Sequence, residues 1–117
     1  MKSALLVCTG ILAVTAFFVL NQPALSADKS TKPSVELGKK LFNDPSLGTN
    51  GKSCATCHAS DDNIAKLANK KVWFGGGAKT LEQAINFCIN GPLAGKPLPE
   101  DSVEAKSIAM YMKSLIN

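Results

Sequence analysis

Arginine is absent from this 117-residue chain: all thirteen basic residues are lysines, and they outnumber nine acidic residues to give a formal net charge of +4. Arginine is the residue that binds phosphates and guanine edges through two parallel hydrogen bonds, so its absence argues against nucleic-acid binding. The mild lysine charge instead favours acidic or redox protein partners. A mass of 12.3 kDa leaves room for one small domain and no second globular unit.

Long apolar runs are missing except at the N-terminus, where residues 4–20 follow Lys2 and precede the small residues Ala24, Ser26 and Ala27. This pattern predicts a cleaved export signal over residues 1–27 and a periplasmic or otherwise exported protein. A retained membrane anchor is the alternative, but seventeen residues fall short of the roughly 20 that a spanning helix needs. We expect a flexible segment at 28–33, one domain at 34–117 and no membrane span after cleavage.

Cysteine is also scarce, and two of the four cysteines fall in one short motif. Cys54, Cys57 and His58 form a C-x-x-C-H run, which in an exported protein predicts covalent attachment of one haem c. Two thiols at this spacing reach the two vinyl groups of one porphyrin, and His58 then serves as the proximal iron ligand. A thioredoxin-like pair or half of a zinc site fits less well, because turn-forming residues precede the motif and no second C-x-x-C exists.

Hydrophobic spacing and capping residues predict an all-α domain without strands. A first helix is expected after Ser34 and before Asp44, a short helix at 62–70, and a helix at 81–90 opened by a capping box of Thr80 and Gln83. The last helix is expected to begin after Asp101 or Ser102. Its predicted buried stripe consists of Val103, Ala105, Ile108, Ala109, Met112, Leu115 and Ile116.

This order of elements resembles the class I cytochrome c fold. The resemblance is carried by Gly38-Lys39-Lys40-Leu41-Phe42 in the first helix and by Ile108 and Tyr111 in the last. It implies that the two helices cross and that one covalently bound haem lies among the helices. Gly38 would allow the two backbones to approach closely.

The distal iron ligand departs from that family's pattern, because no methionine lies in the loop before the last helix. Met110 and Met112 both fall inside that helix, where we expect them to pack. Cys88, on the inward side of the 81–90 helix, is the favoured ligand, although a free cysteine can also be a small buried hydrophobe. A lysine would first have to lose a proton of pKa about 10.4. Trp73 is a candidate for packing on the haem edge or bonding a propionate, with an ordinary core role as the alternative.

A second resemblance concerns Ile85-Asn86-Phe87-Cys88, the segment 95–99 and Tyr111. These residues are similar to the cytochrome domains of thiosulfate-oxidising enzymes and to the small subunits of the heterodimeric, nitric-oxide-binding cytochrome c complex of anaerobic ammonium oxidisers. The resemblance implies a haem bound by His58 and Cys88, and a homologous cytochrome subunit as partner.

A thiolate ligand donates electron density to iron and lowers its reduction potential. We therefore expect a low-potential haem that binds nitric oxide or carbon monoxide when reduced, in a protein that is not itself an enzyme. An electron-transfer cytochrome and the haem subunit of a thiosulfate-oxidising-type enzyme are the alternatives.

Overall fold

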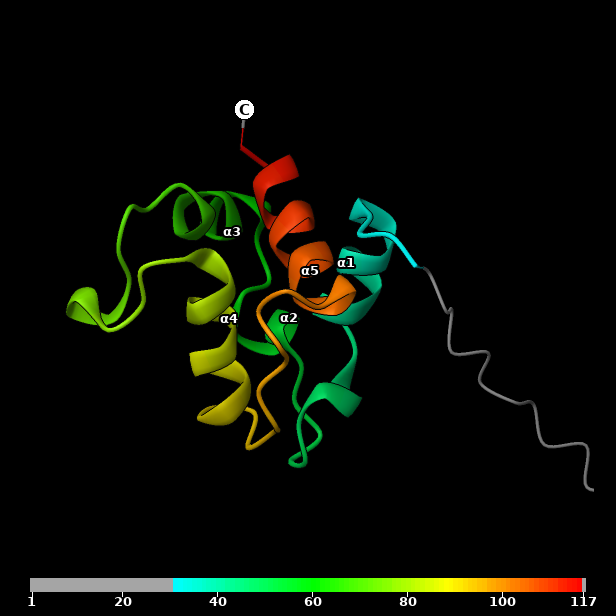
Figure 1. Cartoon of the computed structure of the whole chain (residues 1–117). Coiled ribbons are helices and arrows are strands. Elements are labelled where there is room, and N and C mark those ends of the chain that lie inside the picture. Colours follow the sequence, from blue (N-terminus) through cyan, green and yellow to red (C-terminus); the bar gives the residue numbers. More distant parts are fainter. Residues whose placement is uncertain (1–30, 117) are drawn as a thin grey trace, which may run out of the picture.

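The structure is a computed structural model that describes residues 31–116. The predicted signal at 1–27 and the first part of the predicted tail, residues 28–30, lie outside the described residues. The described chain is helical, with one isolated bridge between Trp73 and Ala78 and no strand (Figure 1). This confirms the all-α prediction. The elements in order are α1 (Val35–Phe42), η1 (Pro45–Leu47), α2 (Cys54–Cys57), α3 (Asp61–Ala68), η2 (Phe74–Gly76), α4 (Leu81–Asn90) and α5 (Val103–Ser114).

Helices α1 and α5 form the main packing pair, and they lie side by side in Figure 1. Gly38 of α1 faces the backbone of α5, so that a Cβ atom built there would lie 1.9 Å from the Ser107 carbonyl oxygen. The Ser34 backbone N–H donates to Ser107 Oγ at 3.1 Å across the same contact. The edge of the Phe42 ring meets Tyr111 at a centroid distance of 5.4 Å. The predicted close approach at Gly38 is therefore present.

Side-chain caps begin α1, α4 and α5, as the sequence predicted. Ser34, Thr80 and Ser102 each accept a hydrogen bond at 3.1 Å from the backbone N–H three residues later. The capping-box prediction is wrong in one detail: Gln83 Oε1 accepts from the Lys79 N–H at 2.9 Å rather than from the N–H of Thr80. The short third helix occupies Asp61–Ala68 rather than 62–70.

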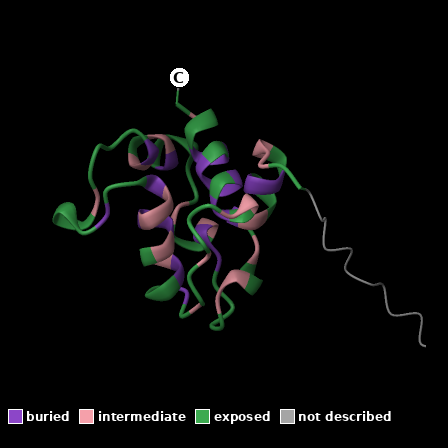
Figure 2. Cartoon of the chain, viewed as in Figure 1, coloured by how far each residue is buried: buried purple, intermediate pink, exposed green. Residues whose placement is uncertain are grey.

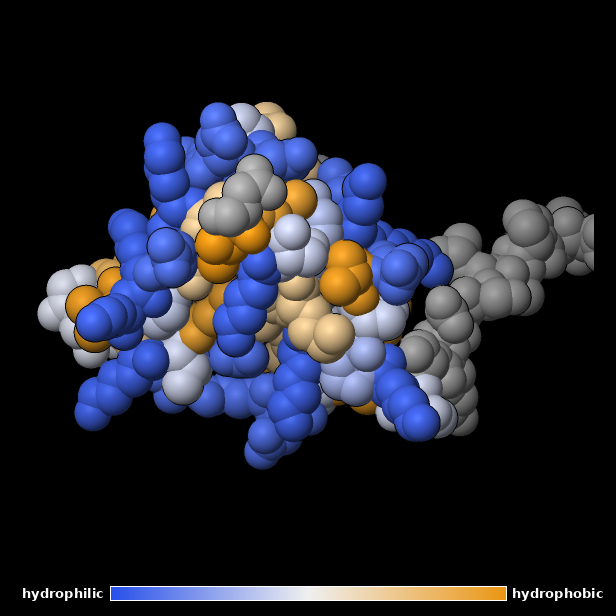
Figure 3. Space-filling view, turned by 90° about the horizontal axis from the view of Figure 1, so that it is seen from above, coloured by the Kyte–Doolittle hydropathy of each residue, from blue (hydrophilic) through white to orange (hydrophobic). Residues whose placement is uncertain are grey.

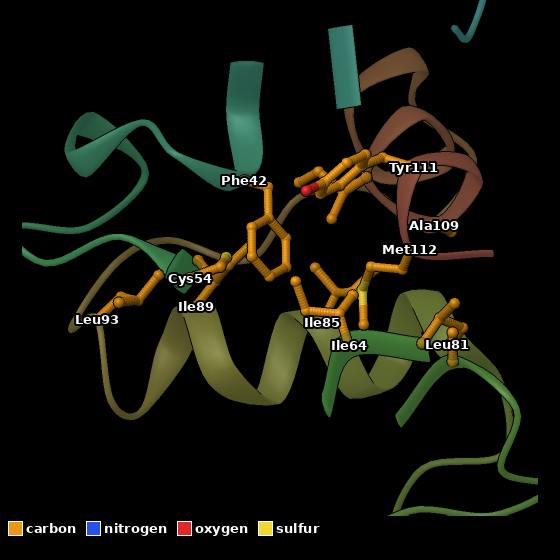
Figure 4. Close-up of a cluster of buried hydrophobic side chains, with 12 residues drawn as sticks. Phe42, Cys54, Ile64, Leu81, Ile85, Ile89, Leu93, Ala109, Tyr111 and Met112 are labelled. Carbon is orange, nitrogen blue, oxygen red and sulfur yellow. The ribbon is translucent and has the colours of Figure 1, made fainter. Parts of the chain in front are cut away.

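The buried core lies between α4 and the α1–α5 pair, as the purple segments of Figure 2 show. Figure 4 shows Phe42, Ile85, Ile89 and Met112 converging from three helices. The predicted stripe of α5 is wrong at its C-terminal end, where Ile116 is 39% exposed because the helix has already ended at Ser114.

Two loops fix the segment that precedes the cysteine motif. The Thr49 N–H donates to the Leu93 carbonyl at 3.0 Å, and the Thr49 hydroxyl donates to the Ala94 carbonyl at 2.7 Å. Asn50 Nδ2 donates to the Pro92 carbonyl at 2.8 Å. These bonds hold the approach to α2 against the C-terminal end of α4.

The segment before α5 is held in turn by one amide side chain. Asn86 of α4 donates from Nδ2 to the Leu98 carbonyl at 2.7 Å and accepts from the Leu98 N–H at 2.8 Å. The loop in which class I cytochromes carry a methionine is thereby tied to the helix that carries Cys88.

Hydrophilic side chains cover much of the face seen in Figure 3, with hydrophobic residues exposed in separate patches between them. Across residues 31–116, no helix combines the length and apolar character needed to cross a bilayer.

Candidate haem site

The cysteine motif forms a single helical turn, α2, with its first thiol inside and its second outside. Ser53 precedes the turn, and its N–H donates to Thr56 Oγ1 at 2.9 Å, which satisfies one of the free donors at the helix start. Cys54 is buried and Cys57 is exposed. The His58 N–H closes the turn by donating to the Cys54 carbonyl at 3.0 Å. The short helix thus places two thiols and an imidazole at the edge of the core.

His58 is held at its Nδ1 atom by a side chain of the next helix. Asn63 Oδ1 lies 3.2 Å from His58 Nδ1. An amide oxygen carries no proton, so the imidazole nitrogen must be the donor. The pair therefore favours the tautomer with its proton on Nδ1 and a free lone pair on Nε2, which is the form that binds iron.

An apolar cavity opens beside this turn, with a volume of about 650 Å³ that includes its open mouth. Its walls are almost entirely hydrophobic, and the lining side chains that could bind iron are the thiols of Cys54 and Cys88, the His58 imidazole and the Met112 thioether. The lining residues are Phe42, Cys54, His58, Leu67, Trp73, Phe74, Leu81, Ala84, Ile85, Cys88, Ile108 and Met112.

The Cys88 thiol of α4 lines this cavity. It is far from the cysteine motif in the sequence but close to it in space. Burial, and secondarily the nearby Cys57 thiol, raises the pKa of Cys88 above its ordinary value. Burial also raises the pKa of Cys54 to about 11, with a smaller contribution from Cys88. Within residues 31–116, no three His, Cys, Asp or Glu side chains form a cluster that could bind a metal ion unaided.

Met112 also lines the cavity, which the sequence analysis did not anticipate. The sequence had placed this residue only in the packing stripe of the last helix. It does pack there, since it is buried and belongs to the core cluster with Ile64 and Ile85 (Figure 4). The periodicity of the last helix indicated an inward side chain, but not that the core at this point borders a cavity.

The loop between α3 and α4 supplies two further aromatic walls. Trp73 lines the cavity, and its indole N–H donates to the Leu67 carbonyl at 2.8 Å, so that this donor is already engaged within the protein. Phe74 lines the cavity although it is 57% exposed, and its ring stacks on Phe87 at a centroid distance of 5.0 Å. The hydrogen bond from Trp73 to the Leu67 carbonyl favours a packing role for Trp73 over propionate binding. The part played by Phe74 was missed, because nothing local in the sequence joins it to Phe87.

These observations define a class of protein. An all-α domain that presents C-x-x-C-H beside an apolar cavity is a c-type cytochrome. More particularly, the chain belongs to the family described as di-haem cytochrome c peroxidase, whose match covers residues 32–94, more than half of the chain. No curated protein and no solved structure gave a match.

Membership of this family implies covalently bound haem c and electron transfer. The family's description names two haems, whereas this sequence holds one C-x-x-C-H motif and one histidine. The family match does not test the finer resemblance to class I monohaem cytochromes or to the nitric-oxide-binding complex.

Proposed function

We propose that this protein is a monohaem cytochrome c whose iron lies between His58 and Cys88 and which binds nitric oxide or carbon monoxide in its reduced state. The observation that carries the proposal is that Cys54, His58 and Cys88 open onto one apolar cavity. The single C-x-x-C-H motif supports one haem per chain.

The residues present fit such a group. Aromatic and aliphatic walls suit the faces of a porphyrin, and Cys54 of α2 lines the cavity, whereas Cys57 is exposed three residues further on and lies outside the lining. His58, with its Nδ1 already engaged, has Nε2 free for the iron. When bound, the haem supplies a one-electron redox centre and a position at which a small diatomic ligand can bind.

We favour Cys88 over Met112 as the distal ligand because the two side chains differ in how much core packing would be lost if they bound the iron. Met112 fills part of the core, and removing a buried side chain of this size from packing costs about 2–5 kcal/mol. Cys88 is half-buried, lies outside the core cluster and already lines the cavity, so that its sulfur could bind iron without opening a void in the core. A thiolate is also the stronger donor to ferric iron.

The surroundings of Cys88 influence the protonation of its thiol. Burial raises the pKa of this thiol, so that when it is not bound to a metal the neutral form would be favoured in the apolar cavity. The same apolar walls favour a neutral diatomic molecule over an anion. Cys88 would bind the iron of a ferric haem, and the reduced haem would supply a position for a neutral diatomic ligand.

The assignment is tested by the ferric absorption and electron paramagnetic resonance spectra of the matured protein. We expect Cys88→Ala to abolish the thiolate signature and Met112→Leu, the matched control at the other cavity sulfur, to leave it intact. A parental spectrum in Cys88→Ala, or a loss of the signature in Met112→Leu, contradicts the assignment. Titration of the reduced protein with nitric oxide should shift the Soret band; an unchanged band contradicts the gas-binding function.

Peroxide reduction is the second candidate, because the matching family carries that activity in its description. The reaction consumes two electrons for each hydrogen peroxide, whereas one haem iron supplies one on passing from ferrous to ferric. The candidate is tested by mixing the reduced protein with hydrogen peroxide and an excess of reduced donor cytochrome. Sustained oxidation of the donor would favour this function over gas binding.

We also propose that the protein is exported and binds a protein partner, such as a homologous cytochrome subunit. The exposure of three large apolar side chains supports the partner: Phe74, which lines the cavity, and Val72 are each 57% exposed, and Phe87, which stacks on Phe74, is 49% exposed. The predicted signal at 1–27 supports export. Co-purification of the matured chain with a second haem protein of similar size would support the heterodimer.

A further inference from the structure

We infer that Asn63 is a positioning residue for the haem iron: its side-chain oxygen holds the His58 imidazole in the ligating tautomer and limits how much electron density that ligand donates. The inference rests on the proposed role of His58 as the proximal ligand. It adds a residue that neither the cysteine motif nor the family match assigns.

Both partners of the contact are fixed by their own backbones. The Asn63 N–H donates to the Ser60 carbonyl at 3.1 Å and lies 3.4 Å from Ser60 Oγ, within the first turn of α3. The His58 N–H donates to the Cys54 carbonyl at 3.0 Å. The 3.2 Å separation of Nδ1 and Oδ1 therefore joins two anchored segments rather than two mobile surface groups.

The chemical character of the acceptor determines its effect on the iron. Partners that accept from the second nitrogen of a ligating histidine fix its orientation and raise its basicity. A carboxylate would do so more strongly than a neutral amide, because it draws the Nδ1 proton toward a negative charge. The turn already contains two carboxylates, Asp61 and Asp62, yet the side chain that contacts His58 is the uncharged Asn63.

The contact does more than orient the imidazole. His58 is half-buried and borders a cavity with almost no other polar group, whereas Asn63 is exposed, so the contact lies at the solvent edge of the site. The hydrogen bond acts on the iron through the imidazole ring itself, because its acceptor contacts the second nitrogen of the ligating side chain.

The test uses the full chain matured with haem and three variants. Asn63→Asp keeps the shape of the side chain and supplies a charged acceptor at pH 7; Asn63→Leu removes the acceptor. Asn69→Asp is the matched control, because it makes the same charge change at the exposed C-terminal end of the same helix. The readouts are the reduction potential and the iron–histidine stretching frequency of the reduced protein.

We expect Asn63→Asp to favour the ferric form by about tenfold at a fixed ambient potential, which corresponds to a fall of about 59 mV for one electron. Asn63→Leu should raise the potential and lower the stretching frequency. Asn69→Asp should change the ferric-to-ferrous ratio by less than about twofold, as expected for a screened surface charge.

Two results would overturn the inference: parental values in both Asn63 variants, or an equal effect of Asn69→Asp. If one Asn63 variant fails to mature, the other still decides the outcome. The reduction-potential result is independent of Cys88, since an Asn63 effect in a protein with an unchanged Cys88→Ala spectrum would separate this inference from the proposed distal ligand.

Discussion

Gly38→Ala is expected to destabilise the protein, although alanine is the better helix former. The added Cβ would lie 1.9 Å from the Ser107 carbonyl oxygen and 2.8 Å from Tyr111 Cβ. Ordinary contact begins near 3.4 Å, so α1 and α5 would have to separate by about 1.5 Å, the difference between 3.4 and 1.9. The obstacle is backbone, which cannot turn aside as a flexible side chain can.

The size of the effect follows from three contributions. Forcing extra volume into a packed contact costs about 1–3 kcal/mol. Separation of the helices also strains the hydrogen bond from the Ser34 N–H to Ser107 Oγ, which contributes about 1 kcal/mol. Replacing glycine by alanine in a helix returns about 1 kcal/mol. With the packing cost near its upper end, because the clash is with a carbonyl, the free energy of unfolding should fall by about 2–3 kcal/mol.

Urea denaturation of the matured protein, followed at the Soret band, measures this change. With a slope of about 2 kcal/mol per molar urea, the midpoint should fall by about 1–1.5 M. Lys40→Ala is the matched control, because it lies exposed in the same helix and should change stability by no more than about 0.5 kcal/mol. A Gly38→Ala midpoint equal to or above that of the parent would refute the close crossing of α1 and α5.

Three further outcomes are expected from individual contacts. Trp73→Phe removes the donor to the Leu67 carbonyl and should cost about 1–3 kcal/mol in thermal or chemical unfolding; a neutral result would mean that water replaces the indole N–H. Asn86→Ala removes both bonds to Leu98 and should speed amide exchange at Leu98 in mass spectrometry, whereas exchange in α1 should stay unchanged. In haem-free protein, burial raises the pKa of the Cys54 thiol to about 11. Its alkylation should therefore rise about tenfold per pH unit between pH 8 and 10, and a plateau reached by pH 9 would contradict the burial.

The helices could be predicted because their signals are local. Ser34, Thr80 and Ser102 each cap the helix that follows, and proline or glycine lies soon after two of the helix ends. The close approach of Gly38 to the last helix is a long-range contact that the sequence also indicated. It was available only because the resemblance to class I cytochromes pairs the first helix with the last.

The buried positions were predicted less well where two elements meet. Ile89 is fully buried, although the sequence identified only its neighbour Cys88 as an inward residue of this helix. The reason is the loop that follows α4: its Gly95 N–H donates to the Ile89 carbonyl at 2.7 Å and folds back over the end of the helix. Ser107 is fully buried because its carbonyl lies against Gly38 and its hydroxyl accepts from Ser34. The hydrophobic periodicity of a single helix predicts neither of these environments.

The same limit separates the attachment motif from the rest of the haem site. Five consecutive residues are enough to predict two thioether bonds and an iron ligand, because their spacing alone places two thiols and an imidazole within reach of one porphyrin. The cavity instead depends on residues from α1, α3, α4 and α5, and its polar contacts depend on where α3 begins. Asn63 follows His58 by five residues, a spacing with no meaning until the turn at Ser60 brings the amide back to the imidazole. The properties that distinguish one c-type cytochrome from another, namely its distal ligand and the electron donation of its histidine, therefore belong to the part of the site that tertiary structure assembles.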